Sequence, residues 1–261
     1  MRSSRLLFLA AALLLGGAAN APPGPRVALA ATPIARMDLP WWRARFEQKQ
    51  AELRAHTVDL VFYGDSILQD WEKDGPAPWL RFRPVWSAFY GDRNVVELGF
   101  RGDTTANLLW RLQHGEAEGI APKVAVVLIG ANNLGRVHWS AEETLAGIDA
   151  DVAELRRRLP RTKIVLLSIL PSRRSAWVDA TTEAVNRTLA GRYGNGGEVT
   201  YIDLTPVFVR HGALDESLFL DGFLTPPDPL LHPTPEGQAL MAQAIEPTLA
   251  AMLGDRPHSW H

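Results

Sequence analysis

The stretch Val-Asp-Leu-Val-Phe-Tyr-Gly-Asp-Ser-Ile-Leu-Gln-Asp-Trp, residues 58–71, decides the fold and points to the chemistry. Its first part, Val58 to Tyr63, is an apolar run typical of a buried strand, and Ile67 to Trp71 has the character of a helix start. Gly64-Asp65-Ser66 lies between the two. A serine at a strand-to-helix turn is a candidate nucleophile, although such a serine more commonly caps the helix.

The chain on either side of this stretch alternates between short β-branched runs and helical patterns. Runs that are apolar on both faces predict strands covered on both sides, and alternating β and α units predict a parallel sheet between two helical layers, a three-layer α/β/α fold. The further strand-like runs are Val95 to Leu98, Val124 to Ile129, Lys163 to Ile169 and Val199 to Ile202. The helical patterns are Thr104 to Gln113, Ala141 to Leu159, Val178 to Tyr193, Pro235 to Leu253 and an early helix that Asp38 can cap.

Three polar elements share the placement of Ser66 at the ends of predicted strands or just before a helix. Gly102 follows the second strand, Asn132 follows the third, and His232 precedes the last helix. Ligands of open parallel sheets bind outside the carboxyl ends of the strands, so Ser66, Gly102 and Asn132 are expected to face one crevice.

Ester hydrolysis by a serine needs a base for the hydroxyl proton and hydrogen-bond donors for the developing oxyanion. Ser66 is the candidate nucleophile and His232 the candidate base, while the backbone N–H groups of Ser66 and Gly102 and the side-chain amide of Asn132 are the candidate donors. His138 and His211 lie in loops that could also approach the site. Taken singly, Gly102 is typical of a turn and Asn132 of a capping residue.

These residues together resemble the SGNH, or GDSL-type, hydrolase superfamily. The resemblance rests on Val61 to Ser66, on Gly130-Ala131-Asn132-Asn133, and on Gly102-Asp103-Thr104-Thr105 followed by Leu108 to Leu112, the last being most similar to the platelet-activating-factor acetylhydrolase catalytic-subunit branch. It implies a flavodoxin-like sheet of five parallel strands, no metal or organic cofactor, and the same roles for Ser66, Gly102, Asn132 and His232. An α/β-hydrolase elbow would need a glycine where Leu68 stands.

The carboxylate behind His232 departs from the family pattern. An Asp three residues before the His is usual there, whereas position 229 is Pro229 and Asp228 lies four residues before His232. We expect Asp228 to complete the triad Ser66, Asp228, His232 through a one-residue bulge. Asp221 is the rival across an inserted loop, and a dyad of Ser66 and His232 is the third alternative. Asp65 is expected to shape the turn through local hydrogen bonds.

Residues 1–30 have the order of charge, apolar core and small residues that is typical of a secretory signal. We expect cleavage after Ala30 rather than after Ala21, because the latter would leave Pro22 at the new terminus; an uncleaved anchor is the alternative. Residues 31–261 are then a single SGNH hydrolase domain in the periplasm or outside the cell. The 261 residues contain no Cys, so no disulfide forms, and a net charge of −2 gives no basic surface for nucleic acid.

The sequence therefore predicts an exported serine esterase that hydrolyses short acyl esters, expected to be acetyl esters, of a carbohydrate, lipid or other small alcohol. The alternatives are an O-acyltransferase acting on a glycan hydroxyl and a carbohydrate-binding domain that has lost the chemistry. The partner is expected to be a small-molecule or glycan ester, without stable membrane insertion after cleavage, and the chain to be a monomer or homodimer.

Overall fold

The computed structural model describes residues 28–260 and contains a five-stranded parallel sheet in the order β2-β1-β3-β4-β5. This is the order of flavodoxin-like folds. Every residue of the central strands β1 and β3 is buried, which confirms the predicted strands covered on both faces. The strands are β1 (Leu60–Gly64), β2 (Val95–Gly99), β3 (Val124–Leu128), β4 (Lys163–Leu167) and β5 (Val199–Ile202).

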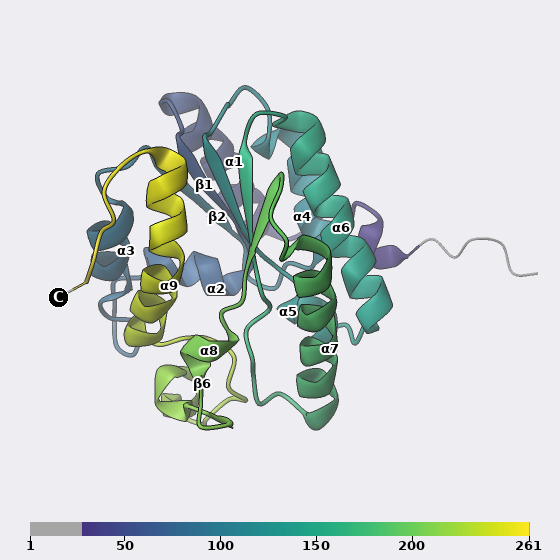
Figure 1. Ribbon diagram of the computed structural model, residues 1–261, viewed down its shortest axis with the longest axis vertical. Helices are drawn as coiled ribbons and strands as arrows, with labels where there is room; N and C mark the ends of the chain where they lie inside the picture. Colours follow the sequence, from purple (N-terminus) through teal and green to yellow (C-terminus); the bar gives the residue numbers. More distant parts are fainter. Residues whose placement is uncertain (1–27, 261) are drawn as a thin grey trace, which may run out of the picture.

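Two layers of helices enclose the sheet, with α3 and α9 on one side and α4, α6 and α7 on the other (Figure 1). The predicted α/β/α architecture is confirmed. The helices are α1 (Pro40–Ala55), α2 (Ser66–Gln69), α3 (Phe82–Tyr90), α4 (Thr105–Arg111), α5 (Ala131–Gly135), α6 (Ala141–Arg158), α7 (Ala176–Tyr193), α8 (Thr205–Phe208) and α9 (Pro235–Leu253). Short 3-10 turns and one π turn are η1 (Leu29–Ala31), η2 (Asp70–Glu72), η3 (Leu112–Glu116), η4 (Glu216–Leu218) and η5 (Asp221–Phe223), and a small hairpin joins β6 (Val209–Arg210) to β7 (Ala213–Leu214).

The register of the central strands brings their carboxyl ends level. Gly64 at the end of β1 pairs with Gly99 of β2 on one side and with Leu128 of β3 on the other. A Cβ at position 64 would collide with the carbonyl oxygen of Leu128, so only glycine permits this close approach. The chain after β1 and the chain after β3 therefore leave the sheet side by side, at the point where the strand order reverses.

The folded part of the chain begins before residue 31, where the sequence placed the domain boundary. Ala30 in η1 is fully buried against α4 and α6, and its carbonyl accepts a hydrogen bond of 2.8 Å from the Thr105 hydroxyl. Cleavage after Ala30 would remove this packed segment. The rest of the predicted signal, including Ala21, lies outside the described residues, and none of the helices between residues 28 and 260 is long and apolar enough to cross a membrane.

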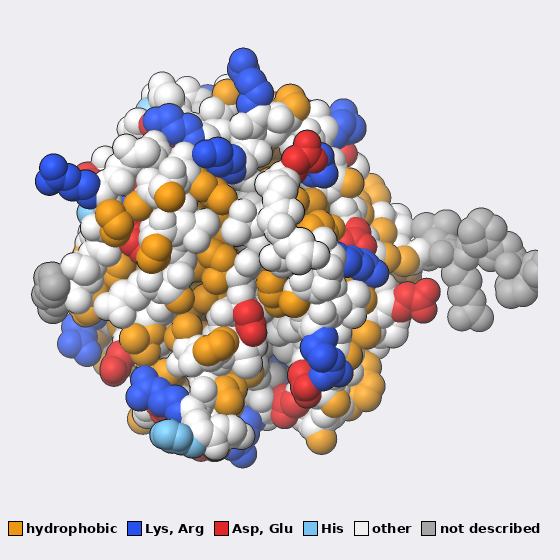
Figure 2. Space-filling model, viewed as in Figure 1, with side chains coloured by type: hydrophobic (Ala, Val, Ile, Leu, Met, Phe, Trp, Pro, Cys, Tyr) orange, Lys and Arg blue, Asp and Glu red, His pale blue; other side chains and the backbone are white. Residues whose placement is uncertain are grey.

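Several local features differ from the sequence-based expectation. Helix α1 begins at Pro40 with Leu39 at its N-cap position, so Asp38 does not cap it, because proline already suits a first helical turn. The sequence did not predict the helices α3, α5 and α8 or the β6–β7 hairpin. The face in Figure 2 carries Lys, Arg, Asp and Glu side chains scattered among hydrophobic ones rather than one charged patch, in keeping with the near-zero net charge.

Candidate active site

The turn after β1 presents Ser66 as the first residue of the short helix α2. Asp65 is the N-cap residue, and its Oδ1 accepts a hydrogen bond of 3.0 Å from the N–H of Ile67. This bond is the local, turn-shaping role expected of Asp65. It holds Ser66 at the end of the strand without using the serine hydroxyl, so that hydroxyl remains free for another partner.

His232 is that partner. Ser66 Oγ lies 2.9 Å from His232 Nε2, and the other ring nitrogen, Nδ1, lies 2.7 Å from Asp221 Oδ1. An ionised carboxylate can only accept, so Nδ1 carries the ring proton and Nε2 accepts from the Ser66 hydroxyl. The three side chains thus form a continuous hydrogen-bonded chain from hydroxyl to carboxylate, with the geometry of a nucleophile, a base and an orienting acid.

The hydrogen bonds to Asp221 keep it ionised. Burial alone would raise the pKa of this carboxyl, but the His232 ring and the backbone N–H groups of Leu231 and His232 outweigh burial and hold its pKa below the usual range. Its Oδ2 accepts from both N–H groups, at 2.7 Å from the nitrogen of Leu231. The same carboxylate therefore fixes the backbone of residues 231 and 232 and the ring of His232.

Asp221, and not Asp228, holds the histidine ring. The side chain of Asp228 is exposed, and this residue meets Asp221 through its backbone, whose N–H donates to the Asp221 carbonyl at 3.1 Å. The physical reason is the course of the loop: Phe219 and Pro233 form an antiparallel bridge, which returns the chain past Asp221 and brings it beside His232. The expected bulge at Asp228 does not occur.

Asn132 joins the three turns that carry the candidate residues. Its side-chain Nδ2 donates to the carbonyl of Asp103 at 3.0 Å and lies 3.4 Å from Asp65 Oδ2. Asp103 adjoins Gly102 and Asp65 adjoins Ser66, so the expected oxyanion donors are drawn to one place. Gly102 has a φ of 74°, in the left-handed region that favours glycine.

A buried arginine beneath these turns was not predicted from the sequence. Arg111 of α4 is fully buried, donates to the carbonyls of Gly64 and Leu98 at 3.1 and 3.2 Å, and pairs with Asp103 and Glu116. It thereby ties the ends of β1 and β2 to the turn after β2. The signal in the sequence is a charged residue inside the apolar run Leu108 to Leu112, because a buried charge needs partners.

Asp65 has an unusual protonation equilibrium for a carboxyl beside the site. Burial is the main cause that raises its pKa to about 7, with the neighbouring carboxyls of Asp103 and Asp70 adding to the shift, while the bond from Ile67 and the charge of His232 oppose it. Asp65 therefore carries its proton through much of the range in which Asp221 is ionised.

The other candidates from the sequence lie elsewhere. The ring of His138 lies 5.7 Å from the ring of Trp177, and His211 is exposed at the turn between β6 and β7. Ser66 is bonded to His232 instead. Within residues 28–260, no group of three or more His, Asp or Glu side chains is arranged to hold a metal ion.

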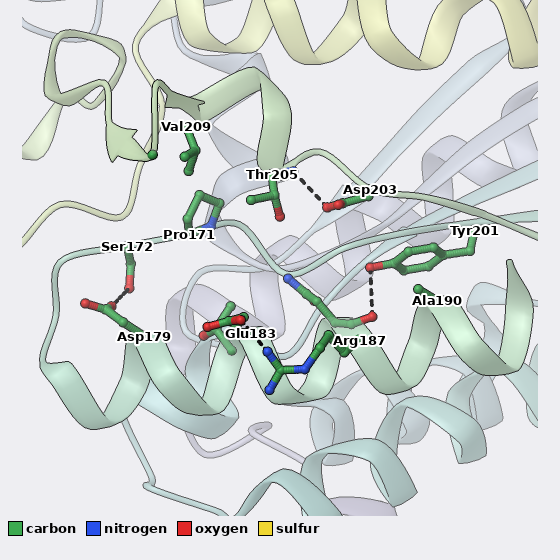
Figure 3. A pocket seen from close by; sticks show the side chains of 13 residues that line it. Pro171, Ser172, Asp179, Glu183, Arg187, Ala190, Tyr201, Asp203, Thr205 and Val209 are labelled. Atoms are coloured by element: carbon green, nitrogen blue, oxygen red, sulfur yellow. Dashed lines mark hydrogen bonds and ion pairs between the residues drawn. The ribbon is translucent and has the colours of Figure 1, made fainter.

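A pocket of about 540 Å³ lies beside α7, where the chain after β4 and β5 lines it (Figure 3). None of the candidate catalytic residues lines it. Its carboxylates already have partners: Asp179 with the Ser172 hydroxyl, Glu183 with Arg187, and Asp203 with the N–H of Thr205. This pocket is therefore separate from the candidate active site.

Known proteins share both the sequence pattern and the fold. The family model for GDSL-like Lipase/Acylhydrolase matches residues 62–240. Platelet-activating factor acetylhydrolase IB subunit alpha2 of Rattus norvegicus is 28% identical over 218 residues, which cover 83% of this chain and 86% of the rat protein. The protein of the same name from Gallus gallus is 32% identical over 130 residues, 50% of this chain, so the match spans about half (52%) of its length.

Solved structures agree on the architecture. A GDSL-like lipase from Bacteroides thetaiotaomicron superposes with a TM-score of 0.62 at 19% identity, over 80% of this chain and 97% of the other. A carbohydrate esterase family 3 protein from Talaromyces cellulolyticus gives a TM-score of 0.56 at 21% identity, over 77% of this chain and 100% of the other. The predicted resemblance to SGNH hydrolases is confirmed. The chain belongs to the GDSL-like lipase/acylhydrolase family and is a carboxylic ester hydrolase.

Proposed function

We propose that this protein is an exported serine esterase that removes short acyl groups, above all acetyl, from a small alcohol through an acyl-enzyme intermediate. The observation that carries the proposal is the hydrogen-bonded chain Ser66–His232–Asp221, with 2.9 Å and 2.7 Å between the bonded atoms. At these distances His232 can take the proton of the Ser66 hydroxyl while Asp221 orients the imidazole ring.

In the acylation step, Ser66 Oγ attacks the ester carbonyl carbon as His232 Nε2 takes the hydroxyl proton. Asp221 stabilises the resulting imidazolium across the 2.7 Å contact. The carbonyl oxygen becomes an oxyanion, which the N–H groups of Ser66 and Gly102 and the amide of Asn132 stabilise. That amide has two acceptors in this structure, the Asp103 carbonyl at 3.0 Å and Asp65 Oδ2 at 3.4 Å, and the oxyanion would replace the longer and weaker of the two.

The tetrahedral intermediate collapses by breaking the bond between the carbonyl carbon and the alcohol oxygen. The imidazolium of His232 returns its proton to that oxygen, and the alcohol leaves an acyl group on Ser66. Water then attacks the acyl carbon while Nε2 takes a water proton. The second collapse breaks the acyl bond to Oγ, His232 reprotonates Ser66, and the carboxylic acid departs.

The acyl and alcohol classes are supported by the names of similar proteins. The rat relative is named an acetylhydrolase, and a structural neighbour is a carbohydrate esterase.

Export is supported by Arg2 and Arg5 ahead of the apolar core Leu6 to Leu15. It is tested by expressing the full chain in bacteria and finding whether the protein, with a shortened N-terminus, reaches the periplasm.

The activity is tested with purified protein, nitrophenyl esters of increasing acyl length and a fluorophosphonate probe. We expect turnover that is fastest for acetate and probe attachment at Ser66, identified by peptide mass spectrometry. Ser66→Ala removes both, whereas Ser87→Ala, on the exposed face of α3, retains both. Absence of turnover together with absence of label at Ser66 would show that the proposal is wrong.

A further inference from the structure

Two arginines beside the candidate active site have no carboxylate partner within residues 28–260. Arg136 is the C-cap residue of α5, and Arg174 lies in the segment between β4 and α7. Other arginines nearby are paired: Arg173 with Glu216 at 3.2 Å and Arg101 with Asp70 at 3.4 Å. The guanidinium groups of Arg136 and Arg174 are therefore available to an anion from outside the chain.

The guanidinium of Arg136 lies against Gly102, and that of Arg174 contacts the residue before Asn132. Nη1 of Arg136 occupies the space that a Cβ on Gly102 would fill, and Nη1 of Arg174 donates to the carbonyl of Ala131 at 3.1 Å, one residue before Asn132. Arg136 thus contacts one expected donor, and Arg174 contacts the neighbour of another. One small molecule would then span from an anionic group bound by both arginines to an ester at Ser66.

The charged groups that interact with Arg174 include two residues of the candidate active site. Burial lowers the pKa of its guanidinium, and its electrostatic neighbours are Asp65, Asp221 and Arg136. Asp65 belongs to the nucleophile turn and Asp221 to the proton relay, so Arg174 lies near both. Asp221 is already bonded to His232 and two backbone N–H groups, which leaves the positive charge of Arg174 without a partner of its own.

Two aromatic rings lie on the same two chain segments as the arginine pair. Trp177, three residues after Arg174, is 45% exposed, and its ring lies 5.7 Å from that of His138, two residues after Arg136. The helices α5 and α7 that carry these segments lie side by side (Figure 1). An exposed aromatic ring and cationic donors on the same two segments suit a ligand with a flat apolar face and an acidic group.

We propose that Arg136, Arg174 and Trp177 form a subsite for an acidic sugar whose O-acyl group is presented to Ser66. The sugar carboxylate binds the two guanidinium groups, and the sugar ring packs on Trp177. The inference rests on the proposed esterase function and specifies its alcohol. Substrate preference would then come from the alcohol side of the ester, while the acyl group meets the oxyanion donors.

The test compares mono-O-acetylated methyl glucuronoside with mono-O-acetylated methyl glucoside, which differ only in the carboxylate. We expect wild-type kcat/KM to favour the glucuronoside by roughly 10- to 100-fold, as fits a charge-assisted hydrogen-bonded pair. Arg136→Gln and Arg174→Gln are each expected to lower that ratio about tenfold, chiefly through KM. Raising the ionic strength lowers the wild-type ratio as well.

Arg173→Gln is the matched control, because Arg173 neighbours Arg174 but is paired with Glu216. It should leave the ratio unchanged. Equal wild-type kcat/KM for the two sugars, or arginine variants that slow both sugars equally, would overturn the subsite. Preference for an acetylated glucoside 6-phosphate alone would replace the sugar acid with a phosphate.

A binding measurement separates this inference from the proposed activity. Ser66→Ala should bind the acetylated glucuronoside more tightly than the acetylated glucoside in calorimetry, and lose that difference on adding Arg174→Gln. Failure of nitrophenyl acetate turnover contradicts the esterase proposal. Turnover of nitrophenyl acetate without any difference in sugar binding contradicts only the subsite.

Discussion

Replacing Asp221 with Asn is expected to lower kcat for ester hydrolysis by about 10³- to 10⁴-fold. The carboxylate lies 2.7 Å from His232 Nδ1, so its charge lies about 4 Å from that of the imidazolium, and at the effective dielectric constant of such sites the attraction is about 4 kcal/mol. That energy is about a factor of 10³ in rate. Loss of the correct tautomer adds to it, and the corresponding change in a serine protease costs about 10⁴.

The assay is the pre-steady-state and steady-state release of nitrophenol from nitrophenyl acetate at neutral pH. Asp228→Asn is the matched control: its side chain is exposed, and it should change kcat by less than about twofold. Thermal unfolding of both variants checks that the fold persists. The reasoning would be refuted if Asp221→Asn kept kcat within tenfold of the wild type, or if Asp228→Asn caused an equal loss.

Three further predictions concern stability. Arg111→Met is expected to lower the free energy of unfolding by about 3–5 kcal/mol in urea titrations, because it removes the cation that pairs with the buried carboxylates of Asp103 and Glu116. The exposed Arg187→Met should cost under about 1 kcal/mol. Asp65 has a folded pKa of about 7, above its unfolded value, so its contribution is present at low pH and is lost as pH rises from about 4 to 7; Asp65→Asn should remove up to about 4 kcal/mol of this decline, measured by unfolding at each pH. A chain starting at Ala31 should be about 1–3 kcal/mol less stable by calorimetry than one starting at Ala28, because Thr105 loses its acceptor on Ala30; equal stabilities would contradict this role.

Much of the fold and most of the site follow from local sequence. Buried β-branched runs and helical spacing identify the strands, and the rule that parallel strands end at one edge brings Ser66 close to Asn132 without any knowledge of contacts. His232 was identified because imidazole is the side chain that titrates near neutral pH. Each of these inferences uses the pattern within a strand or helix, or a residue at its end, and the sequence shows such patterns directly.

The sequence does not predict features that depend on contacts between segments far apart in the chain. Asp221 lies 11 residues before His232, and the bridge between Phe219 and Pro233 that brings them together has no sequence periodicity to announce it. Arg111 likewise acquires its meaning from carbonyls on two strands and acids on two turns. Cleavage after Ala30 stays a prediction, and the small side chain that suits a peptidase also packs tightly against α6.

The loop between Asp221 and His232 is closed at its base, and this has a consequence for how such an enzyme can change. The bridge at Phe219 and Pro233, the bond from the N–H of Leu220 to the carbonyl of His232 at 2.8 Å, and the carboxylate of Asp221 lock acid and base into one rigid unit. Residues 222–229 connect the two sides of that closure, and most of them are exposed. We expect insertions among these exposed residues to leave the proton relay intact, because the contacts that fix Asp221 beside His232 lie at the base of the loop.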